Sequence, residues 1–163
     1  MKRLVILLSA LALLAWPAVV SADHGTDSVR GNVRLFGQIE VNVSARSSQA
    51  GSDASGRVTF TNTITDPNQT WRGDVTCLRI VGATATTAAT FYTVARVTDA
   101  PPGDFAQSIH VFGTDAGKFA QAPDTLAAFT SSLPAPPDGA CPVPTFSGSP
   151  VSDGEVTIHN SLP

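Results

Sequence analysis

Histidine is the side chain in this sequence best suited to binding a metal ion or moving a proton, and the chain has three: His24, His110 and His159. His110 and His159 each stand on the polar phase of an alternating apolar and polar segment, so both face solvent if those segments are strands. Neighbouring strands could bring the two imidazoles together around a metal ion, but the spacing identifies no third ligand. We interpret both as solvated strand histidines and expect no metal and no cofactor.

The sequence contains no strong signature of a catalytic nucleophile. Ser147-Gly148-Ser149-Pro150 lacks the flanking glycines of a nucleophile elbow and lies in a proline-rich segment. A small extracellular hydrolase would need His110 or His159 beside a hydroxyl or carboxylate in a cleft. We predict that the protein is not an enzyme, with such a hydrolase as an alternative.

The acidic residues also have a structural interpretation. Glu40 and Glu155 are the two glutamates, and most aspartates stand beside Gly, Pro or Ser, where turn formation accounts for them. Asp99 and Asp104 flank a Pro-Pro-Gly turn, and oxygen-rich turns of this kind can bind calcium. Their spacing does not follow the EF-hand pattern, so a calcium loop remains an alternative only.

Aromatic and arginine side chains mark a candidate contact surface. Phe36 interrupts the polar phase of an alternating segment that also carries Arg34 and Arg46, and Trp71 stands beside a turn. Aromatic residues and arginine are enriched at the centres of interfaces. These four residues are therefore our candidates for contacting a glycan or a protein partner, and ordinary packing at the rim of the core is the alternative.

The first 22 residues read as a cleaved export signal. Lys2-Arg3 precedes the apolar run Leu4–Val20, and small residues lead to a cleavage site between Ala22 and Asp23. An uncleaved membrane anchor is the alternative, but the run of about 17 residues contains Pro17 and is short for a bilayer. We predict a secreted, extracellular protein with no membrane span after cleavage.

Export determines how the two cysteines are interpreted. Cys77 and Cys141 stand 64 positions apart, neither belongs to a Cys-x-x-Cys pair, and neither has a histidine nearby in sequence. Two cysteines in one small exported domain most often form a disulfide. We predict a Cys77–Cys141 disulfide.

Composition limits the size and the partners of the protein. The chain has 163 residues, with 10 basic and 13 acidic side chains. Both basic residues of the signal leave with it, so the remaining chain is more acidic still. This length suits one domain with a modest core, and the acidic balance argues against a nucleic-acid partner, which would require a basic face.

The rest of the chain has the pattern of β-strands. Apolar and polar residues alternate over Val33–Arg46, which predicts one long strand bent at Gly37. Further alternating segments predict strands at residues 57–65, 75–81, 83–90, 91–98, 105–112 and 154–159, with a short helix over 122–130 and a coil over 131–150. We expect residues 23–30 to form a flexible tail and 31–160 a single all-β domain, an antiparallel sandwich or barrel of about seven or eight strands.

Several short motifs resemble those of a known group of proteins. They are Gly73-Asp74-Val75-Thr76-Cys77-Leu78, Pro137-Asp138-Gly139-Ala140-Cys141 and Val151-Ser152-Asp153-Gly154-Glu155-Val156. In this order they resemble small uncharacterised secreted β-rich proteins common in actinobacteria. The resemblance implies a bacterial, exported β domain and supports the cysteine pairing, and it implies no catalytic residues.

These observations favour a secreted, non-enzymatic β domain that serves as a binding or structural module. A barrel that carries a small apolar ligand is the alternative, and it would need an apolar cavity inside. We expect a monomer whose partner is an extracellular macromolecule or a cell-envelope component.

Overall fold

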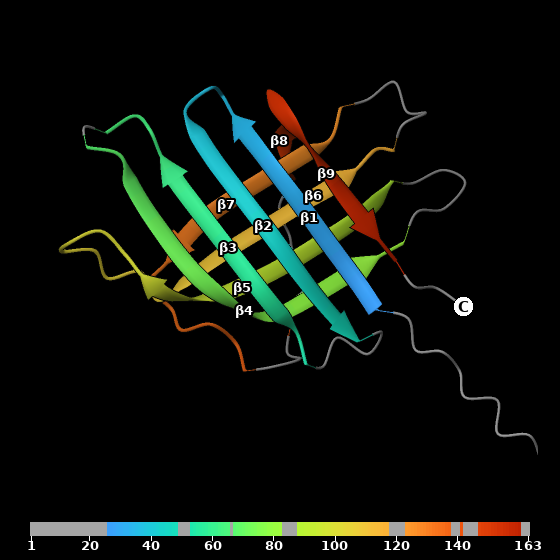
Figure 1. The fold of residues 1–163 in the computed structure, drawn as a ribbon, viewed down its shortest axis with the longest axis horizontal. Helices are drawn as coiled ribbons and strands as arrows, with labels where there is room; N and C mark the ends of the chain where they lie inside the picture. The colour runs from blue at the N-terminus through green and yellow to red at the C-terminus, as the bar shows by residue number, and fades with distance from the viewer. Residues whose placement is uncertain are drawn as a thin grey trace, which may run out of the picture.

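The computed structural model describes residues 26–48, 53–65, 67–82, 88–117, 123–137, 141 and 147–160. Within these ranges the chain forms strands and no helix (Figure 1). The strands are β1 (Thr26–Leu35), β2 (Ile39–Ser48), β3 (Ser55–Asn62), β4 (Gln69–Val81), β5 (Ala89–Asp99), β6 (Ser108–Asp115), β7 (Thr125–Ser131), β8 (Ser149–Pro150) and β9 (Asp153–His159).

All nine strands belong to one antiparallel sheet in the order β8-β7-β6-β5-β4-β3-β2-β1-β9. Strands β1 to β8 pair with their neighbours in sequence, and β9 returns to pair with the free edge of β1. The sheet curls strongly, so that β5, β6 and β7 pass behind β1, β2 and β3 (Figure 1). The predicted all-β fold of the barrel or sandwich class is confirmed.

The core lies inside the curl because each strand turns its apolar phase inward. On β1 and β2, for example, Val29, Val33, Val41 and Val43 are all buried, while the residues between them are polar or glycine. Alternation of this kind buries one face of a sheet and leaves the other to water. Large side chains fill the inside, and those with almost no exposure include Phe91, Leu78, Ile109 and Leu126.

Two aspartates bridge the seam where the edges of the sheet approach one another. Asp124 Oδ2 accepts from the Val156 backbone N–H and Asp115 Oδ2 from the Ile158 N–H, both at 2.9 Å. Both donors belong to β9, whereas the acceptors flank the β6–β7 connection. Carboxylates thus satisfy edge N–H groups that would otherwise be free to pair with another chain.

The predicted long strand over 33–46 is in fact a hairpin. β1 ends at Leu35, and the Gln38 N–H donates to the Leu35 carbonyl at 3.0 Å across the turn. Phe36 and Gly37 both have positive φ, 53° and 69°, as tight hairpin turns require. Leu35 pairs with Ile39, which leaves three residues between them. The inward-facing residues therefore have odd numbers on both strands, and the apolar and polar alternation continues through the turn without a break.

Two other expectations from the sequence are wrong. Residues 125–131 form β7 rather than part of a helix, because this segment pairs with β6 along its whole length and buries Leu126 in the core. Residues 26–30, expected in a flexible tail, belong to β1 and pair with both β2 and β9. In both places sheet pairing outweighs local composition.

The disulfide depends on a bulge in β4. The register with β5 shifts between Val75 and Cys77, so the inward phase passes from Val75 to Leu78 and Cys77 turns to the outer face. There Cys77 is bonded to Cys141 with an S–S distance of 2.08 Å, which confirms the predicted pair. The bond forms a small second core with Tyr92, Val94, Phe112 and Ala135.

Some predictions fall on residues outside the described ranges. These are the signal segment 1–22 with its cleavage site at Ala22 and Asp23, His24, most of the strand predicted at 83–90 and parts of the 131–150 coil. In the described part of the chain there is no helix long and apolar enough to cross a membrane.

Replacing Phe36 with glycine tests the strain in the β1–β2 turn. Phe36 is 67% exposed, so little packing is lost, and a side chain at positive φ costs about 1–2 kcal/mol. We expect Phe36→Gly to raise the free energy of unfolding by about 0.5–1 kcal/mol in urea titrations, after allowing for the entropy of glycine in the unfolded chain. Gln38→Gly, in the same turn without positive φ, should give no gain. An equal gain in stability from both variants would contradict the assignment of backbone strain to Phe36.

Removing the disulfide tests its contribution to the second core. The bond closes a loop with a sequence separation of 64 residues. We expect Cys77→Ala with Cys141→Ala to lower the free energy of unfolding by about 2–4 kcal/mol under non-reducing conditions. Dithiothreitol should lower the stability of the wild type toward that of the variant and leave the variant unchanged. A reductant-insensitive wild type would contradict the pairing.

Candidate functional site

The outer face of β9, β1, β2 and β3 carries four rows of polar side chains set by strand register. The first row is His159, Ser28, Arg46 and Ser55, and the second is Thr157, Arg30, Ser44 and Arg57. The third is Glu155, Asn32, Asn42 and Thr59, and the fourth is Asp153, Arg34, Glu40 and Thr61. Cations therefore dominate the first two rows, and acidic side chains appear in the last two.

A hollow of about 680 Å³ lies over the basic end of this face. Its lining comes from four strands and consists of Thr26, Ser28, Arg30, Ser44, Ala45, Arg46, Ser55, Gly56 and His159. Two guanidinium groups, one imidazole and several hydroxyl groups thus border one open space. Guanidinium N–H groups and hydroxyls donate hydrogen bonds, so the hollow is suited to an anionic, oxygen-rich ligand.

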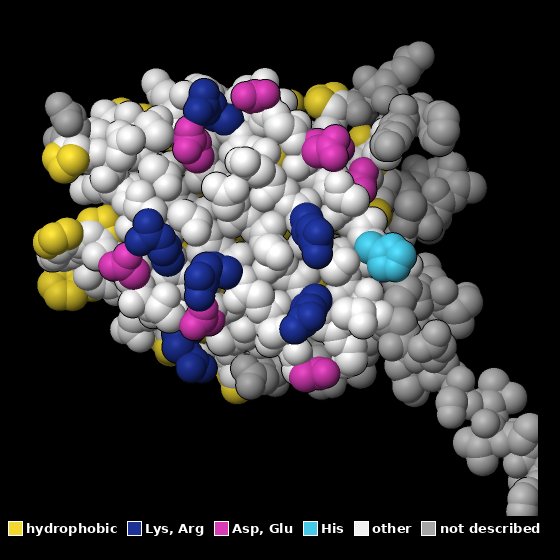
Figure 2. Space-filling model, viewed as in Figure 1, with side chains coloured by type: hydrophobic (Ala, Val, Ile, Leu, Met, Phe, Trp, Pro, Cys, Tyr) yellow, Lys and Arg dark blue, Asp and Glu magenta, His cyan; other side chains and the backbone are white. Residues whose placement is uncertain are grey.

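The two arginines of the hollow differ from the others on this face. Arg34 pairs with Glu40, Arg72 on β4 pairs with Asp99 at 2.7 Å, and Arg57 lies 3.8 Å from Asp74. Among the described residues Arg30 and Arg46 have no acidic partner, and Arg46 donates its Nε–H to Ser55 Oγ at 3.2 Å. Figure 2 shows this face, on which neighbouring basic side chains lie without an acidic one between them.

A second polar cluster lies on the outer face of β5 and β6, beneath the segment that follows β7. His110 is partly buried, stacks on Phe129 with ring centroids 4.8 Å apart, and is hydrogen-bonded through both nitrogens. Tyr92 Oη lies 2.5 Å from Nδ1 and Ser108 Oγ 3.0 Å from Nε2. His110 is therefore not the solvated side chain that the sequence predicts, whereas His159 is exposed.

The hydrogen bonds of this cluster assign one tautomer to the imidazole. Ser108 donates its hydroxyl proton to the Leu133 carbonyl at 2.8 Å, so its oxygen must accept from Nε2–H of His110. Nδ1 then accepts from the Tyr92 hydroxyl. Burial lowers the pKa of His110 and raises the pKa of Tyr92, which favours the neutral form of both rings.

The Ser108–His110 pair meets part of the condition for the hydrolase alternative. The hydroxyl is fully buried, and its proton is committed to the Leu133 carbonyl. A substrate could reach it only if the segment after β7 moved away. The pair therefore serves to attach that segment to β6.

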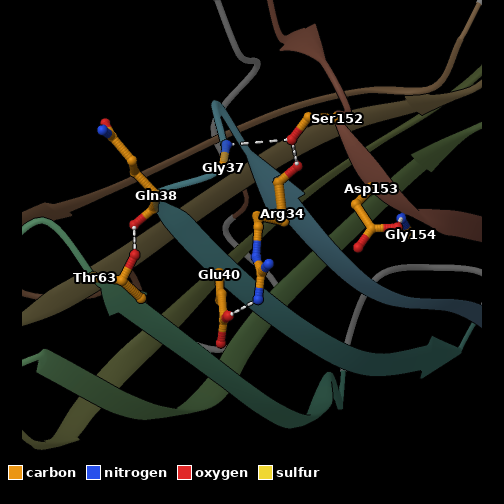
Figure 3. Close-up of polar contacts among 8 residues, drawn as sticks. All are labelled: Arg34, Gly37, Gln38, Glu40, Thr63, Ser152, Asp153 and Gly154. Atoms are coloured by element: carbon orange, nitrogen blue, oxygen red, sulfur yellow. Dashed lines mark hydrogen bonds and ion pairs between the residues drawn. The ribbon is translucent and has the colours of Figure 1, made fainter.

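The loops that follow the odd-numbered strands β1, β3, β5 and β7 lie at one end of the sheet and carry exposed apolar side chains. Phe36, Ile64, Phe105 and Leu133 are 67%, 62%, 84% and 70% exposed, each in a different connection. The Gly37 N–H donates to Ser152 Oγ, and the Thr63 hydroxyl donates to the Gln38 carbonyl at 2.7 Å (Figure 3). These bonds fix the β1–β2 turn that presents Phe36. We call the four residues the apolar rim.

The four residues predicted as one contact surface do not lie together. Trp71 is only 6% exposed and packs in the core against Phe60, with ring centroids 5.4 Å apart, so it is not a surface residue. Arg34 and Phe36 lie at the turn end of β1, whereas Arg46 lies at the opposite end of the face. Of the four, Arg46 lines the hollow.

The proposed calcium turn has its carboxylates engaged by protein groups. Asp99 pairs with Arg72, and Asp104 Oδ1 accepts from the Ala106 N–H at 2.6 Å. In the described part of the chain, no three His, Cys, Asp or Glu side chains gather as metal ligands.

No family model, curated protein or solved structure matches this chain. The resemblance to actinobacterial secreted proteins therefore stays a prediction, and the site must be interpreted from its own geometry.

The His110 cluster predicts a loss of stability in mild acid. The pKa of His110 is lower in the folded chain than its ordinary value near 6.5. At a pH between the folded and the unfolded pKa, the unfolded state therefore binds more protons than the folded state. The free energy of unfolding should therefore keep its full value above about pH 6.5. Below that pH it should fall by at most about 1.4 kcal/mol per pH unit.

Urea titrations between pH 8 and pH 5 measure this dependence. His110→Gln should flatten the profile between pH 7 and pH 5.5, whatever its effect on stability at pH 8. His159→Gln, which removes an exposed imidazole, is the matched control. A variant at His110 with an unchanged profile would show that another group titrates.

Proposed function

We propose that this chain is an exported, monomeric, non-enzymatic binding module that contacts an extracellular macromolecule or a component of the cell envelope. The hollow at Arg30 and Arg46 would be part of its binding face. The observation that carries this proposal is the arrangement of charge. Two arginines lacking acidic partners among the described residues share an open, hydroxyl-lined hollow, while Arg34 at the other end of that face is paired with Glu40 and Arg57 makes only a long contact of 3.8 Å with Asp74.

Several observations support export and a binding role. The apolar N-terminal segment has the pattern of a cleaved signal, and a disulfide is typical of proteins from oxidising compartments. The inside of the sheet is packed with large side chains, which favours a surface module over the carrier alternative. The buried Ser108 hydroxyl gives little support to the hydrolase alternative.

Co-sedimentation with the cell-envelope fraction of the producing cells tests this function. We expect the wild type to sediment with the envelope and the double variant Arg30→Gln with Arg46→Gln to bind about tenfold more weakly, since each lost charge-assisted hydrogen bond removes about 1.5–3 kcal/mol before solvent screening. The control is Arg34→Gln with Arg72→Gln, which removes two ion-paired arginines near the same face.

Three outcomes would contradict the proposal. A wild type that stays in the supernatant would remove the envelope as partner. Equal loss in both double variants would indicate a nonspecific charge effect. Binding that survives Arg30→Gln with Arg46→Gln but is lost in Phe36→Ser with Phe105→Ser would move the binding surface to the apolar rim.

A further inference from the structure

We infer that the hollow over β9, β1 and β2 binds phosphate or sulfate ester groups carried on an extracellular polymer. This inference rests on the proposed function and names its ligand class. It follows from the chemistry of the side chains that border the hollow and from the exposure of the face to solvent. It also follows from the absence of acidic residues and of Phe, Tyr and Trp in the first two rows.

The basic side chains reach the hollow from three strands. Arg30 comes from β1, Arg46 from β2 and His159 from β9. Ser44 lies among them, directly opposite Arg30 in the register and two residues before Arg46 on the same strand. Donors that come from several sides suit a tetrahedral anion, whose three or more free oxygens point in different directions. A carboxylate offers two oxygens in one plane and would satisfy fewer of them.

Arg57 extends the positive field beyond the hollow. It stands opposite Ser44 on β3, so Arg30 and Arg57 lie two strand spacings apart, about 10 Å. Its contact with Asp74 is long at 3.8 Å, and both side chains are more than half exposed, so the pair adds little stability and leaves Arg57 available to a ligand. Repeated anionic groups along one polymer could therefore occupy the hollow and its β3 margin together.

The open face favours a polymer over a free ion. An ion on an exposed surface gains little from one or two arginines, because water and salt screen the attraction. A polymer adds its second charge from the same molecule, which raises the effective concentration at the site. The serine and threonine hydroxyls around the arginines can accept and donate hydrogen bonds to the polymer backbone.

Recognition must proceed by charge rather than by stacking on sugar rings. The four rows of this face contain no Phe, Tyr or Trp side chain, so the face offers no large apolar platform to a neutral glycan. Glu155 stands in the row next to the basic rows, and Asp153 and Glu40 stand one row further along; these carboxylates would repel an anionic chain that crossed them. The ligand segment is therefore confined to the end of the sheet where β9 and β2 finish.

Binding of the purified full-length exported protein to immobilised polymers tests the ligand class. The probes are dextran sulfate, dextran phosphate, polygalacturonate and uncharged dextran. We expect binding to dextran sulfate, dextran phosphate or both, at least about fivefold weaker binding to polygalacturonate, and none to dextran. The better of the two esters identifies the source of the anionic group, and free phosphate at the same anion concentration should compete poorly.

Salt and variants locate the binding. The logarithm of the affinity should fall against the logarithm of the NaCl concentration with a slope of about −3, as expected for three charges neutralised by Arg30, Arg46 and Arg57. Arg30→Gln with Arg46→Gln should lower affinity about tenfold and bring this slope to about −1. Arg34→Gln with Arg72→Gln should change affinity less than about twofold.

The results separate this inference from the proposed function. Loss of envelope binding in Arg30→Gln with Arg46→Gln, together with no binding to either ester polymer, would overturn the ligand class and leave the binding face in place. Preference for polygalacturonate would overturn the tetrahedral anion in favour of a carboxylate. Ester binding that is equal in both double variants would overturn the hollow as its site. Unfolding titrations of each variant show whether a loss of binding reflects misfolding.

Discussion

The structure depends on one constraint, that a single sheet with one apolar face must curl until that face is covered by itself. Nine strands provide enough sheet to do so, and the core forms between β1–β3 and β5–β7 without a helix in the described part of the chain (Figure 1). Closure leaves a seam at β9, where two aspartate carboxylates accept the outer N–H groups. The other phase of each strand then faces outward. On β1, β2 and β3 this phase is polar, whereas on β4, β5 and β6 it carries the apolar side chains of the second core.

The two halves of the outer surface are used differently. Over β4, β5 and β6 the outer face is covered, because a bulge turns Cys77 outward and the disulfide holds Cys141 against Tyr92 and Val94. The Ser108–Leu133 hydrogen bond attaches the segment after β7 to the same region. Over β9, β1, β2 and β3 the outer face stays open, and there the register places two arginines in one hollow. The proposed function follows from this contrast.

Much of the fold could be predicted from the sequence, because period-two alternation reports directly which phase of a strand is buried. The same signal failed at the β1–β2 hairpin, since a three-residue turn keeps the buried residues on odd numbers and leaves the alternation intact. It also left Trp71 unplaced: a turn lies beside it in sequence, but it shares the inward phase of Gly73 and Val75. His110 was correctly placed on the outward phase, yet its burial comes from a segment more than twenty residues later, which no local pattern records.

The site was harder to predict than the fold because it arises from register between strands. Arg30, Arg46 and His159 are separated in sequence, and only the pairing of β1 with both β2 and β9 brings them to one hollow. Their solvent-facing phase could be deduced from alternation. The sequence could not show which arginines have acidic partners, because that depends on which residues stand opposite one another across neighbouring strands.

The most direct test of the binding face is an NMR titration of the ¹⁵N-labelled protein with a short sulfated oligosaccharide. We expect amide chemical shifts to change at residues 28–30, 44–46, 55–57 and 157–159, with little change at the turn around Phe36. Shifts confined to that turn and to the loops of Ile64 and Phe105, or no shifts at any concentration, would contradict this expectation.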